Sequence, residues 1–307
     1  MLERMELLVS SKNIEKVRNT KILIVGIGGV GGAAFEALVR LGVLNITVID
    51  NDVFSKSNLN RQILSNINNI GNLKVNEAVL RAKSINPDIS IKTYNMFLNE
   101  ANIDEINVND YDYVLDCCDT VTTKYLLIKK CLDSNTKIIS SMGTGNRIDS
   151  TKIVIKDIWK TNNDPLAKVM RKILRDNGIK SKIPVVCSEE LPIKTHSNVV
   201  GSVSLVPNVA GFCMASWVFS DIIYKWGSGF MEKDNLELEL NNEDSQKEGR
   251  SLFNPETTFC EGQTYLDFLM ANAKDDEEKA KIEDTINNYL EVFDNDGTSD
   301  EEEKDEE

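Results

Sequence analysis

Short apolar runs alternate with helical stretches through the first two thirds of the chain. Residues 22–25 are a continuous apolar run and residues 46–49 are apolar except for Thr47, the pattern of strands that are buried on both faces. Between them, residues 33–41 carry apolar side chains at helical spacing. A strand, a helix and a second strand in this order predict two parallel neighbouring strands.

The same alternation continues as far as residue 223. We expect strands at residues 89–94, 111–116, 137–141 and 153–155, and helices at residues 1–20, 74–84, 124–133 and 209–223. This order predicts an α/β fold: a Rossmann-like, doubly wound, mostly parallel sheet with helices on both faces. No apolar run reaches membrane-spanning length, and we interpret residues 209–223 as a core or dimer helix.

Glycines fill the turn after the first strand. Gly26, Gly28, Gly29 and Gly31 lie between that strand and the following helix. Glycine lets backbone N–H groups approach a phosphate where a side chain would clash, and the positive end of a helix favours an anion. Asp50 follows the second strand, where a carboxylate can bind both ribose hydroxyls. The pattern predicts a nucleotide site.

Polar residues after Asp50 bear on the kind of nucleotide. A glycine turn alone would first suggest a dinucleotide. Ser57, Asn58 and Arg61 lie just past the second strand. An arginine with amide side chains suits a triphosphate better than a second ribose. The alternative is that this segment is a polar surface loop.

Two further charged residues fall near the predicted site. Asp119 and Thr120 follow the strand at residues 111–116, at the edge where open α/β sheets bind ligands. A carboxylate that faces a triphosphate is a candidate magnesium ligand. Lys74 begins a helix, where a cation is unfavourable unless an anion lies nearby. Spacing alone would make Lys74 a surface lysine.

Charge is distributed unevenly along the chain. The net charge is −14, but residues 231–307 contain 26 Asp and Glu against 7 Lys and Arg, which leaves residues 1–230 with a net charge of +5. We expect residues 1–230 to form the α/β domain and residues 231–307 to form an acidic extension that is partly disordered. The hypothesis for this extension is that it competes with a polyanion for the basic domain.

Cysteine spacing and the first residues exclude several classes of protein. None of the six cysteines forms a CxxC pair, so a zinc site of the paired-CxxC type is excluded. Cys187 is placed in a crossover loop with no adjacent base to activate it, and His196 in an exposed polar loop. Glu3 and Glu6 interrupt any signal-peptide pattern, so we expect a soluble, cytoplasmic protein with no membrane contact.

Residues 156–182 form a basic stretch. Asp164 and Pro165 predict a helix start, and Gly178 predicts its end. The expected buried residues of this helix are Leu166, Val169, Ile173 and Leu174. Its basic residues are Lys168, Arg171, Lys172 and Arg175. Such a helix is either a solvated face or a surface that binds a phosphate backbone, and the sequence leaves both open.

The motifs occur in the order found in the ubiquitin-activating-enzyme-like superfamily. The chain contains GIGGVGG, VIDNDV, NLNRQ, GNLKVNEA, INPDI and LDCCDT, and it resembles this superfamily over residues 1–226. The segments DPLAKVMRKILRDNGIKSK, VVCSEELP and GSVSLVPNVAGFCMASWVFSDII resemble one branch, the tRNA threonylcarbamoyladenosine dehydratases. Branches that activate ubiquitin-like sulfur carriers usually contain two CxxC pairs, which this chain lacks.

The resemblance implies an enzyme that uses ATP and Mg²⁺ to adenylate a carboxylate. Its substrate would be the N6-threonylcarbamoyladenosine beside the anticodon of tRNA, which cyclises with loss of water. Superfamily members place an arginine at the position of Arg4 in the partner subunit's nucleotide site, which implies a homodimer. The implied catalytic residues are Arg4, Arg61, Lys74 and Asp119, with Asp119 as the metal ligand. The implied ATP-binding residues are Gly26, Gly28, Gly29, Gly31, Asp50, Ser57, Asn58, Arg61, Lys74, Asp119 and Thr120.

Other functions stay open at this point. An adenylyltransferase for a ubiquitin-like sulfur carrier would share the site but would need a protein partner. A nicotinamide oxidoreductase leaves Arg61, Lys74 and Asp119 unexplained, and the intact set of site residues argues against a non-catalytic scaffold. The sequence does not establish which tRNAs are used or whether a sulfur-transfer protein assists.

Overall fold

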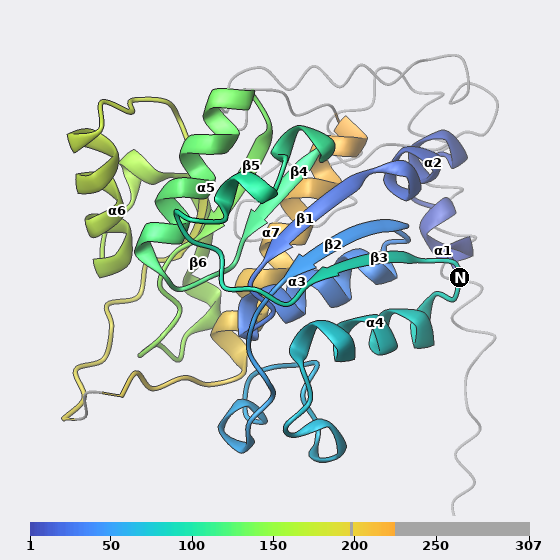
Figure 1. Ribbon diagram of the computed structural model, residues 1–307, viewed down its shortest axis with the longest axis horizontal. Coiled ribbons are helices and arrows are strands. Elements are labelled where there is room, and N and C mark those ends of the chain that lie inside the picture. Colours follow the sequence, from blue (N-terminus) through green and yellow to red (C-terminus); the bar gives the residue numbers. More distant parts are fainter. Residues whose placement is uncertain (197–198, 225–307) are drawn as a thin grey trace, which may run out of the picture. The chain divides into compact units, whose positions relative to one another are not determined.

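The computed structural model describes residues 1–196 and 199–224 (Figure 1). In this part of the chain seven strands form one sheet in the order β3-β2-β1-β4-β5-β7-β6. The strands are β1 (Lys21–Val25), β2 (Asn45–Ile49), β3 (Ser90–Tyr94), β4 (Tyr113–Asp116), β5 (Lys137–Ser141), β6 (Ile153–Asp157) and β7 (Pro184–Ser188). β6 pairs with β7 in antiparallel fashion and the other neighbours are parallel, which confirms the predicted mostly parallel sheet.

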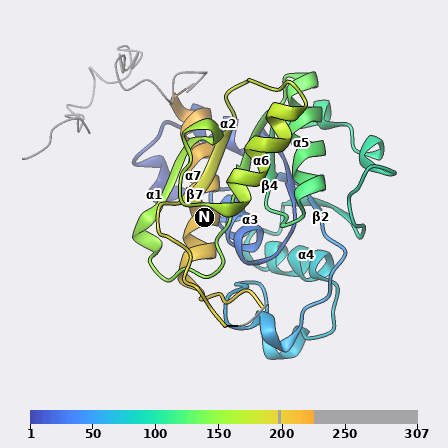
Figure 2. The same ribbon diagram turned by 90° about the vertical axis from the view of Figure 1, so that its left-hand side faces the viewer.

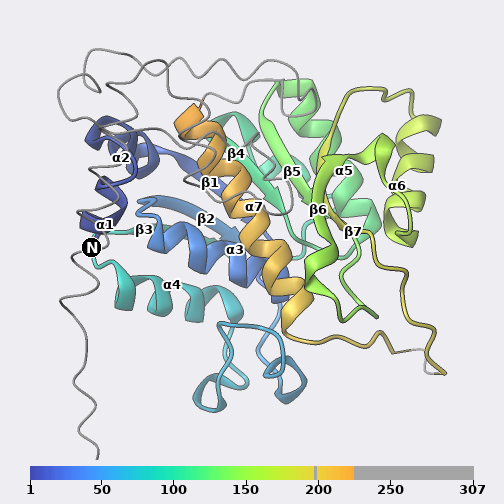
Figure 3. The same cartoon turned by 180° about the vertical axis from the view of Figure 1, so that it is seen from behind.

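Helices cover both faces of the sheet. They are α1 (Glu3–Glu6), α2 (Ser11–Asn19), α3 (Gly29–Arg40), α4 (Lys74–Ile85), α5 (Val121–Ser134), α6 (Pro165–Asp176) and α7 (Leu205–Tyr224). α3, α4 and α7 pack with one face, and α5 and α6 pack with the other (Figures 1 and 3). α5 and α6 lie side by side (Figure 2). Each face buries its own apolar cluster, as expected of a doubly wound fold.

The strand order reverses between β1 and β4. The chain after β1 turns into α3 toward β2, whereas the chain after β4 turns into α5 toward β5. Connections that diverge in this way leave a crevice at the carboxyl ends of the two strands, and open α/β sheets bind their ligands there. The glycine turn and Asp119 both lie at this edge.

α7 is a core helix. Among the described residues it is the helix long and apolar enough to cross a membrane, with a mean hydropathy of 1.3, which corrects the expectation that no apolar run has this length. It packs against α3 so closely that a Cβ at Gly211 would lie 2.2 Å from the Val30 carbonyl oxygen. Half of its most apolar stretch is buried within the fold, in agreement with the predicted core helix.

The amino-terminal prediction was wrong in detail. A single helix was expected over residues 1–20, but α1 ends at Glu6 and α2 begins at Ser11. Ser10 separates them because its side chain accepts a hydrogen bond from the N–H of Asn13, which starts a new helix. α3 also begins earlier than predicted, at Gly29, because the glycines of the turn continue directly into its first turns.

Two further expectations were wrong about burial. Val169 was placed in the buried stripe of α6 but is 45% exposed, and Ala167 and Met170 are buried in its place beside Leu174. Cys187 was placed in a loop but lies buried within β7. The proposed acidic extension, residues 231–307, lies outside the described residues.

Candidate functional site

The turn after β1 depends on two glycines that have no room for a side chain. Gly26 has a φ of 91°, and a Cβ there would lie 3.0 Å from the backbone of Cys117. A Cβ at Gly31 would lie 1.8 Å from the carbonyl oxygen of Gly26. Gly26 also donates its N–H to the carbonyl oxygen of Ile49 at 2.8 Å. These two glycines therefore close the turn and seat α3 against β1.

Gly28 differs from them because it faces open space. A Cβ there would meet only the Gln62 amide nitrogen, at 3.9 Å, whereas a Cβ at Gly29 would lie 3.1 Å from Pro207. The N–H of Gly32 bonds to the carbonyl oxygen of Gly28 and so begins the helical hydrogen bonds. The N–H groups of the first helical turn precede that bond and are available as donors. An anion beside Gly28 would meet these donors and the positive end of α3.

Asp50 and Lys74 lie next to this turn. The Asp50 carboxylate accepts the N–H of Ile27 at 2.6 Å and the N–H of Asp52 at 2.8 Å. Lys74 Nζ is 2.7 Å from the Asp52 carboxylate and 3.9 Å from that of Asp50. Burial raises the pKa of Asp50, and the Lys74 ammonium opposes this shift without cancelling it. The side chain of Lys74 is 5% exposed, so it is not the surface lysine that spacing alone suggested.

The loop at residues 55–62 holds the remaining predicted phosphate ligands. Asn58 is buried, and its Oδ1 accepts the N–H of Ser55 at 3.0 Å, so it shapes the loop. Arg61 Nη1 donates to the carbonyl oxygen of Ser57 at 2.6 Å, which fixes the position of the guanidinium. Asn208 of α7 donates to the carbonyl oxygen of Arg61 at 3.2 Å. The loop is thereby tied to the same helix that packs against α3.

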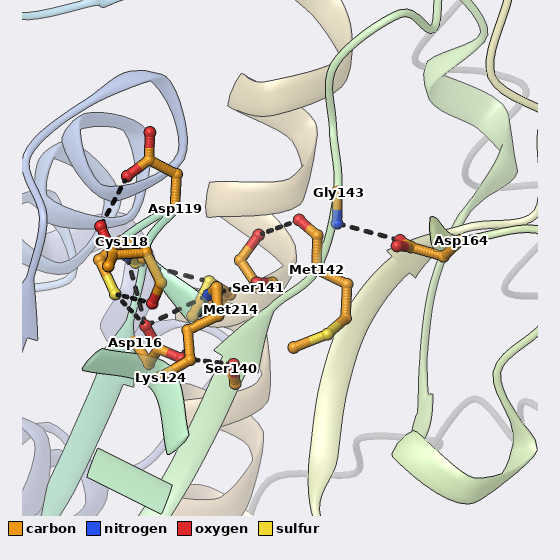
Figure 4. Close-up of polar contacts among 12 residues, drawn as sticks. Asp116, Cys118, Asp119, Lys124, Ser140, Ser141, Met142, Gly143, Asp164 and Met214 are labelled. Atoms are coloured by element: carbon orange, nitrogen blue, oxygen red, sulfur yellow. Dashed lines mark hydrogen bonds and ion pairs between the residues drawn. The ribbon is translucent and has the colours of Figure 1, made fainter. Parts of the chain in front are cut away.

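Asp119 and Thr120 follow β4 at its carboxyl end. Asp119 is exposed, and the Thr120 hydroxyl donates to its Oδ1 at 3.4 Å. Because β4 pairs directly with β1, the Asp119 segment and the glycine turn leave the sheet side by side. In Figure 4 the Asp119 carboxylate points away from the buried polar groups around Asp116. It is exposed to solvent at the carboxyl edge of the sheet.

A buried ion pair lies behind Asp119 and was not predicted from the sequence (Figure 4). Lys124 Nζ is 3.2 Å from both carboxylate oxygens of Asp116 and 2.6 Å from the carbonyl oxygen of Ser141. Ser140 Oγ donates to Asp116 at 2.5 Å, and the Cys118 N–H donates to it at 3.3 Å. Burial alone would lower the pKa of Lys124, but the Asp116 carboxylate raises it overall. The network joins the ends of β4 and β5 to α5.

Comparison with known proteins identifies the family. The model of the ThiF family matches residues 2–242. The chain belongs to the ThiF family. This finding confirms the resemblance to the ubiquitin-activating-enzyme-like superfamily, and the matched residues include the glycine turn.

Several ThiF relatives are similar over much of the chain. The tRNA threonylcarbamoyladenosine dehydratase of Bacillus subtilis (strain 168) is 36% identical over 237 residues, which cover 72% of this chain and 93% of that protein. The structure of E. coli tRNA N6-threonylcarbamoyladenosine dehydratase, TcdA, in complex with AMP matches with a TM-score of 0.69 and 32% identity, over 72% of this chain and 93% of that chain. The same enzyme has been solved with ATP. The adenylyltransferase and sulfurtransferase UBA4 of Saccharomyces cerevisiae (strain RM11-1a) is 38% identical, but over only 42% of this chain and 29% of that protein.

Arg4 is not brought to the glycine turn of its own chain. It lies in α1, and the preceding Leu2 packs against Gly42, where a Cβ would lie 2.6 Å from Leu2 Cδ1. Gly42 follows the carboxyl end of α3, whereas the glycine turn lies at its amino end. A helix of 12 residues is roughly 18 Å long. Arg4 therefore contributes to a ThiF site only if that site belongs to another subunit.

The described cysteines are poor candidates for a thioester nucleophile. They are buried or half-buried, and burial raises the pKa of Cys187 to about 11 and that of Cys131 to about 12. Burial likewise raises the pKa of Cys117 and Cys118. A thiol with a raised pKa forms little of the reactive thiolate at neutral pH. Cys260 lies outside the described residues, and His196 is exposed as predicted.

The residues present fit ATP. Gly28 leaves an open cradle beside the amino end of α3, and the buried Gln62 Oε1 next to it has no hydrogen-bond partner within the described residues. Because an amide oxygen only accepts hydrogen bonds, a hydroxyl or amino group of a nucleotide would complete its bonding, whereas a phosphate oxygen would not. Gln62 lies beside the glycine turn, and sequence reasoning left it out of the ligand set although it directly follows Arg61.

The residues also fit a magnesium ion held mainly by the nucleotide. Among the described residues no group of three or more His, Cys, Asp or Glu side chains surrounds a metal position. Mg²⁺ is commonly bound by one or two carboxylates together with substrate phosphates and waters. Asp119, exposed at the crevice, offers one such carboxylate.

Proposed function

We propose that this ThiF protein is an ATP-dependent tRNA threonylcarbamoyladenosine dehydratase. The observation that carries the proposal is the near full-length likeness to dehydratases, at 36% identity over 93% of the B. subtilis protein. The site geometry agrees, because the amino end of α3, Lys74 and Asp119 meet at one edge of the sheet. The reaction removes one water from the nucleoside and converts ATP to AMP and pyrophosphate.

The first chemical step is adenylation of the threonine carboxylate of the modified nucleoside. A carboxylate oxygen attacks the α-phosphorus of ATP, and the bond to pyrophosphate breaks. We assign the N–H groups at the amino end of α3 to the phosphates, because Gly28 leaves room for them. Asp50 holds the ribose hydroxyls, and Lys74 and Arg61 neutralise the triphosphate. Mg²⁺ held by Asp119 would offset further negative charge as pyrophosphate leaves.

Ring closure follows without a protein nucleophile. The carbamoyl group attacks the activated carbonyl, AMP departs with the former carboxylate oxygen, and a proton is lost. The protein has only to hold the reacting groups in place and to neutralise charge. The burial of the described cysteines is consistent with this route, since none of them needs to act.

The active form that we propose is a homodimer in the cytoplasm. Arg4 lies at the far end of α3 from the glycine turn of its own chain, so it would serve the partner's site. A guanidinium supplied in this way would meet the phosphates of ATP from the open side of the crevice. A closed two-fold dimer would then contain two equivalent composite sites.

The alternative function is activation of a ubiquitin-like sulfur carrier. The UBA4 relative supports it less well, because the likeness covers only 29% of that protein. The two functions share the adenylation chemistry and differ in the molecule that presents the carboxylate. Pyrophosphate exchange into ATP distinguishes them: modified tRNA should stimulate it, and a carrier protein with a terminal glycine pair should not.

The direct test incubates the protein with ATP, Mg²⁺ and tRNA that contains threonylcarbamoyladenosine. After digestion of the tRNA, mass spectrometry should show the nucleoside lighter by one water, with one AMP formed for each conversion. Omission of ATP is the control for spontaneous cyclisation. An unchanged nucleoside mass in the complete mixture would disprove the proposed activity.

A further inference from the structure

The basic segment around α6 accounts for the positive charge of the whole domain. Residues 156–182 contain eight Lys and Arg against three Asp, a net charge of +5, equal to that of residues 1–230 together. The rest of the domain is therefore balanced in charge. An excess confined to 27 residues is a local feature of one surface.

Two of these eight cations are neutralised or engaged. Lys156 pairs with Glu189 at 2.5 Å, and Arg171 donates to the Thr161 hydroxyl. The other six are exposed: Lys160, Lys168, Lys172, Arg175, Lys180 and Lys182. Two of the three acids, in contrast, are buried as helix caps, where Asp157 accepts the N–H of Trp159 and Asp164 that of Ala167. The exposed charge of the segment therefore consists of six cations against one acid, Asp176, so its net charge of +5 lies on the surface.

Three of the exposed cations form one stripe on α6. Lys168, Lys172 and Arg175 are spaced four and three residues apart, which places them on one face within about 60° of each other. The buried residues Ala167, Met170 and Leu174 lie on the other side. The stripe extends roughly 10 Å along the helix. It faces solvent because the opposite side of α6 is anchored in the core.

This stripe has no ion-pair partner within the described residues, in contrast to neighbouring helical lysines. On α5, Lys129 pairs with Asp133 at 2.6 Å and Lys130 pairs with Asp104 at 2.7 Å. Solvated helix faces commonly contain such compensating pairs. Three cations on one face without such pairs repel one another. A polyanion bound across the three cations would offset this repulsion.

α6 begins close to the site. Its capping residue Asp164 accepts the N–H of Gly143 at 3.0 Å, and Gly143 lies two residues past the end of β5 (Figure 4). β5 pairs with β4, whose carboxyl end leads to Asp119. Neighbouring strands are about 4.8 Å apart. The start of the basic helix is therefore one strand removed from the predicted metal ligand.

We propose that the Lys168–Lys172–Arg175 stripe binds the phosphate backbone of the substrate tRNA and guides its modified nucleoside to the crevice at Asp119. The proposal rests on the proposed function, because it needs a tRNA substrate. Phosphate contacts position a nucleic acid without reading its sequence, so the stripe supports binding of tRNAs in general. RNA helices are recognised mostly through their shape and backbone, which suits a row of cations.

The test compares two charge-matched triple variants of the full chain. One replaces the stripe (Lys168→Gln, Lys172→Gln, Arg175→Gln), and the control replaces three exposed lysines on α2 and α4 (Lys12→Gln, Lys16→Gln, Lys83→Gln). Glutamine has a helix propensity close to that of lysine and arginine, so both variants should unfold like the wild type. Filter binding then measures the affinity for threonylcarbamoyl-modified tRNA between 50 and 300 mM salt.

The stripe variant should lose roughly tenfold or more in tRNA affinity at the lowest salt, and its log–log salt dependence should become shallower by about 2 to 3. Its KM for tRNA should rise while kcat at saturating tRNA and the affinity for ATP stay at the wild-type values. The salt dependence of tRNA affinity should change much less in the control variant.

Equal salt slopes for the two variants would overturn the proposal. So would a stripe variant that binds tRNA like the wild type but loses affinity for an acidic protein, since the stripe would then serve a protein partner. A wild-type protein that neither binds nor dehydrates modified tRNA would instead disprove the proposed function. The two failures are distinguishable, because this one is seen in the wild type, whereas failure of the stripe proposal is seen only when the two variants are compared.

Discussion

Asp119 and Lys124 lie five residues apart but in opposite environments. Asp119 is exposed at the crevice, whereas Lys124 is completely buried against Asp116. The first residue is available to a ligand, and the second can act only by holding the surrounding backbone. Substitution of each should therefore affect a different property, activity in one case and stability in the other.

Asp119→Asn should abolish most activity without unfolding the protein. Asparagine has nearly the same size but lacks the negative charge that a Mg²⁺ ligand supplies. We expect kcat to fall by roughly 10²- to 10³-fold, the usual loss when one electrostatic contact to a transition state is removed. AMP release in the dehydration assay measures it. Asp88→Asn, at an exposed position on the amino-terminal side of the sheet, is the control and should leave kcat unchanged.

Lys124→Met should destabilise the fold because it leaves the Asp116 carboxylate buried without its ion-pair partner. Removal of one partner from a buried pair costs about 3–5 kcal/mol of unfolding free energy. Urea denaturation measures the loss. Lys129→Met on the same helix removes only an exposed pair and should cost about 0.5 kcal/mol or less. Similar midpoints for the two variants would show that the buried pair contributes little.

Local sequence could not reveal this ion pair. Lys124 falls in a helix where a lysine is ordinarily solvated, and Asp116 ends a strand. Their pairing depends on α5 folding back over β4 and β5, a contact that no periodic pattern encodes. Lys74 is a similar case, because Asp52 lies 22 positions earlier in the sequence and approaches it only through the fold of the intervening segment. The residues of the glycine turn, in contrast, were predictable because their spacing is itself the local geometry.

At the scale of elements, the glycine turn combines two requirements in one short sequence. Gly31 allows α3 to contact β1, and Gly28 leaves space in front of the helix. The first is a requirement of packing and the second is a requirement of ligand binding. Alanine substitutions at Gly31 and Gly28 therefore test the packing requirement and the ligand-binding requirement separately.

Gly31→Ala should destabilise the protein strongly, because its Cβ would lie 1.8 Å from a backbone oxygen and α3 would have to move. Gly28→Ala should leave the melting temperature within about 2 °C of the wild type, since its Cβ meets only the Gln62 amide at 3.9 Å. The same methyl group would occupy the phosphate cradle and weaken ATP binding by roughly tenfold or more. Calorimetry of unfolding and of ATP binding measures both. Unchanged ATP affinity in Gly28→Ala would place the phosphates elsewhere.

Element types were predictable from the sequence, but burial was less so. Central strands such as β1 and β4 have apolar runs, and α6 has a cap, a proline and a terminating glycine at the expected places. Val169 was misassigned because α6 packs through the smaller Ala167, and apolar character alone does not identify the inward side of a helix. Cys187 was misassigned because β7 is defined by its pairing with β5 and β6 from earlier parts of the chain, which the local pattern does not encode.

At the scale of the whole molecule, a homodimer can be tested through its composite sites. Arg4→Ala should inactivate a site in the partner subunit, whereas Asp119→Asn inactivates the site of its own chain. A mixed dimer of the two variants contains one site with both native residues. Random association of equal amounts should therefore restore about a quarter of the wild-type activity.

The control for this complementation is a chain that carries both substitutions, mixed with wild type. Co-expression with two different affinity tags isolates the mixed dimer, and light scattering establishes its mass. No activity in the isolated mixed dimer of single variants would mean that Arg4 acts within its own chain, and full activity of the Arg4→Ala homodimer would mean that Arg4 has no role.

The negative charge of residues 231–307 should lower the affinity of the protein for tRNA. These residues carry a net charge of −19 on the same chain as the +5 domain, so we expect them to compete with tRNA phosphates for the domain's cations. Replacement of the seven acids in residues 300–307 by their amides should raise tRNA affinity at 20 mM salt. The gain should shrink at 150 mM, where the Debye length falls to about 8 Å. Deletion of residues 231–307 should give a larger gain in filter binding. Because the amide variant keeps the chain length, an unchanged affinity at low salt in both proteins would show that the acidic segment does not compete with tRNA.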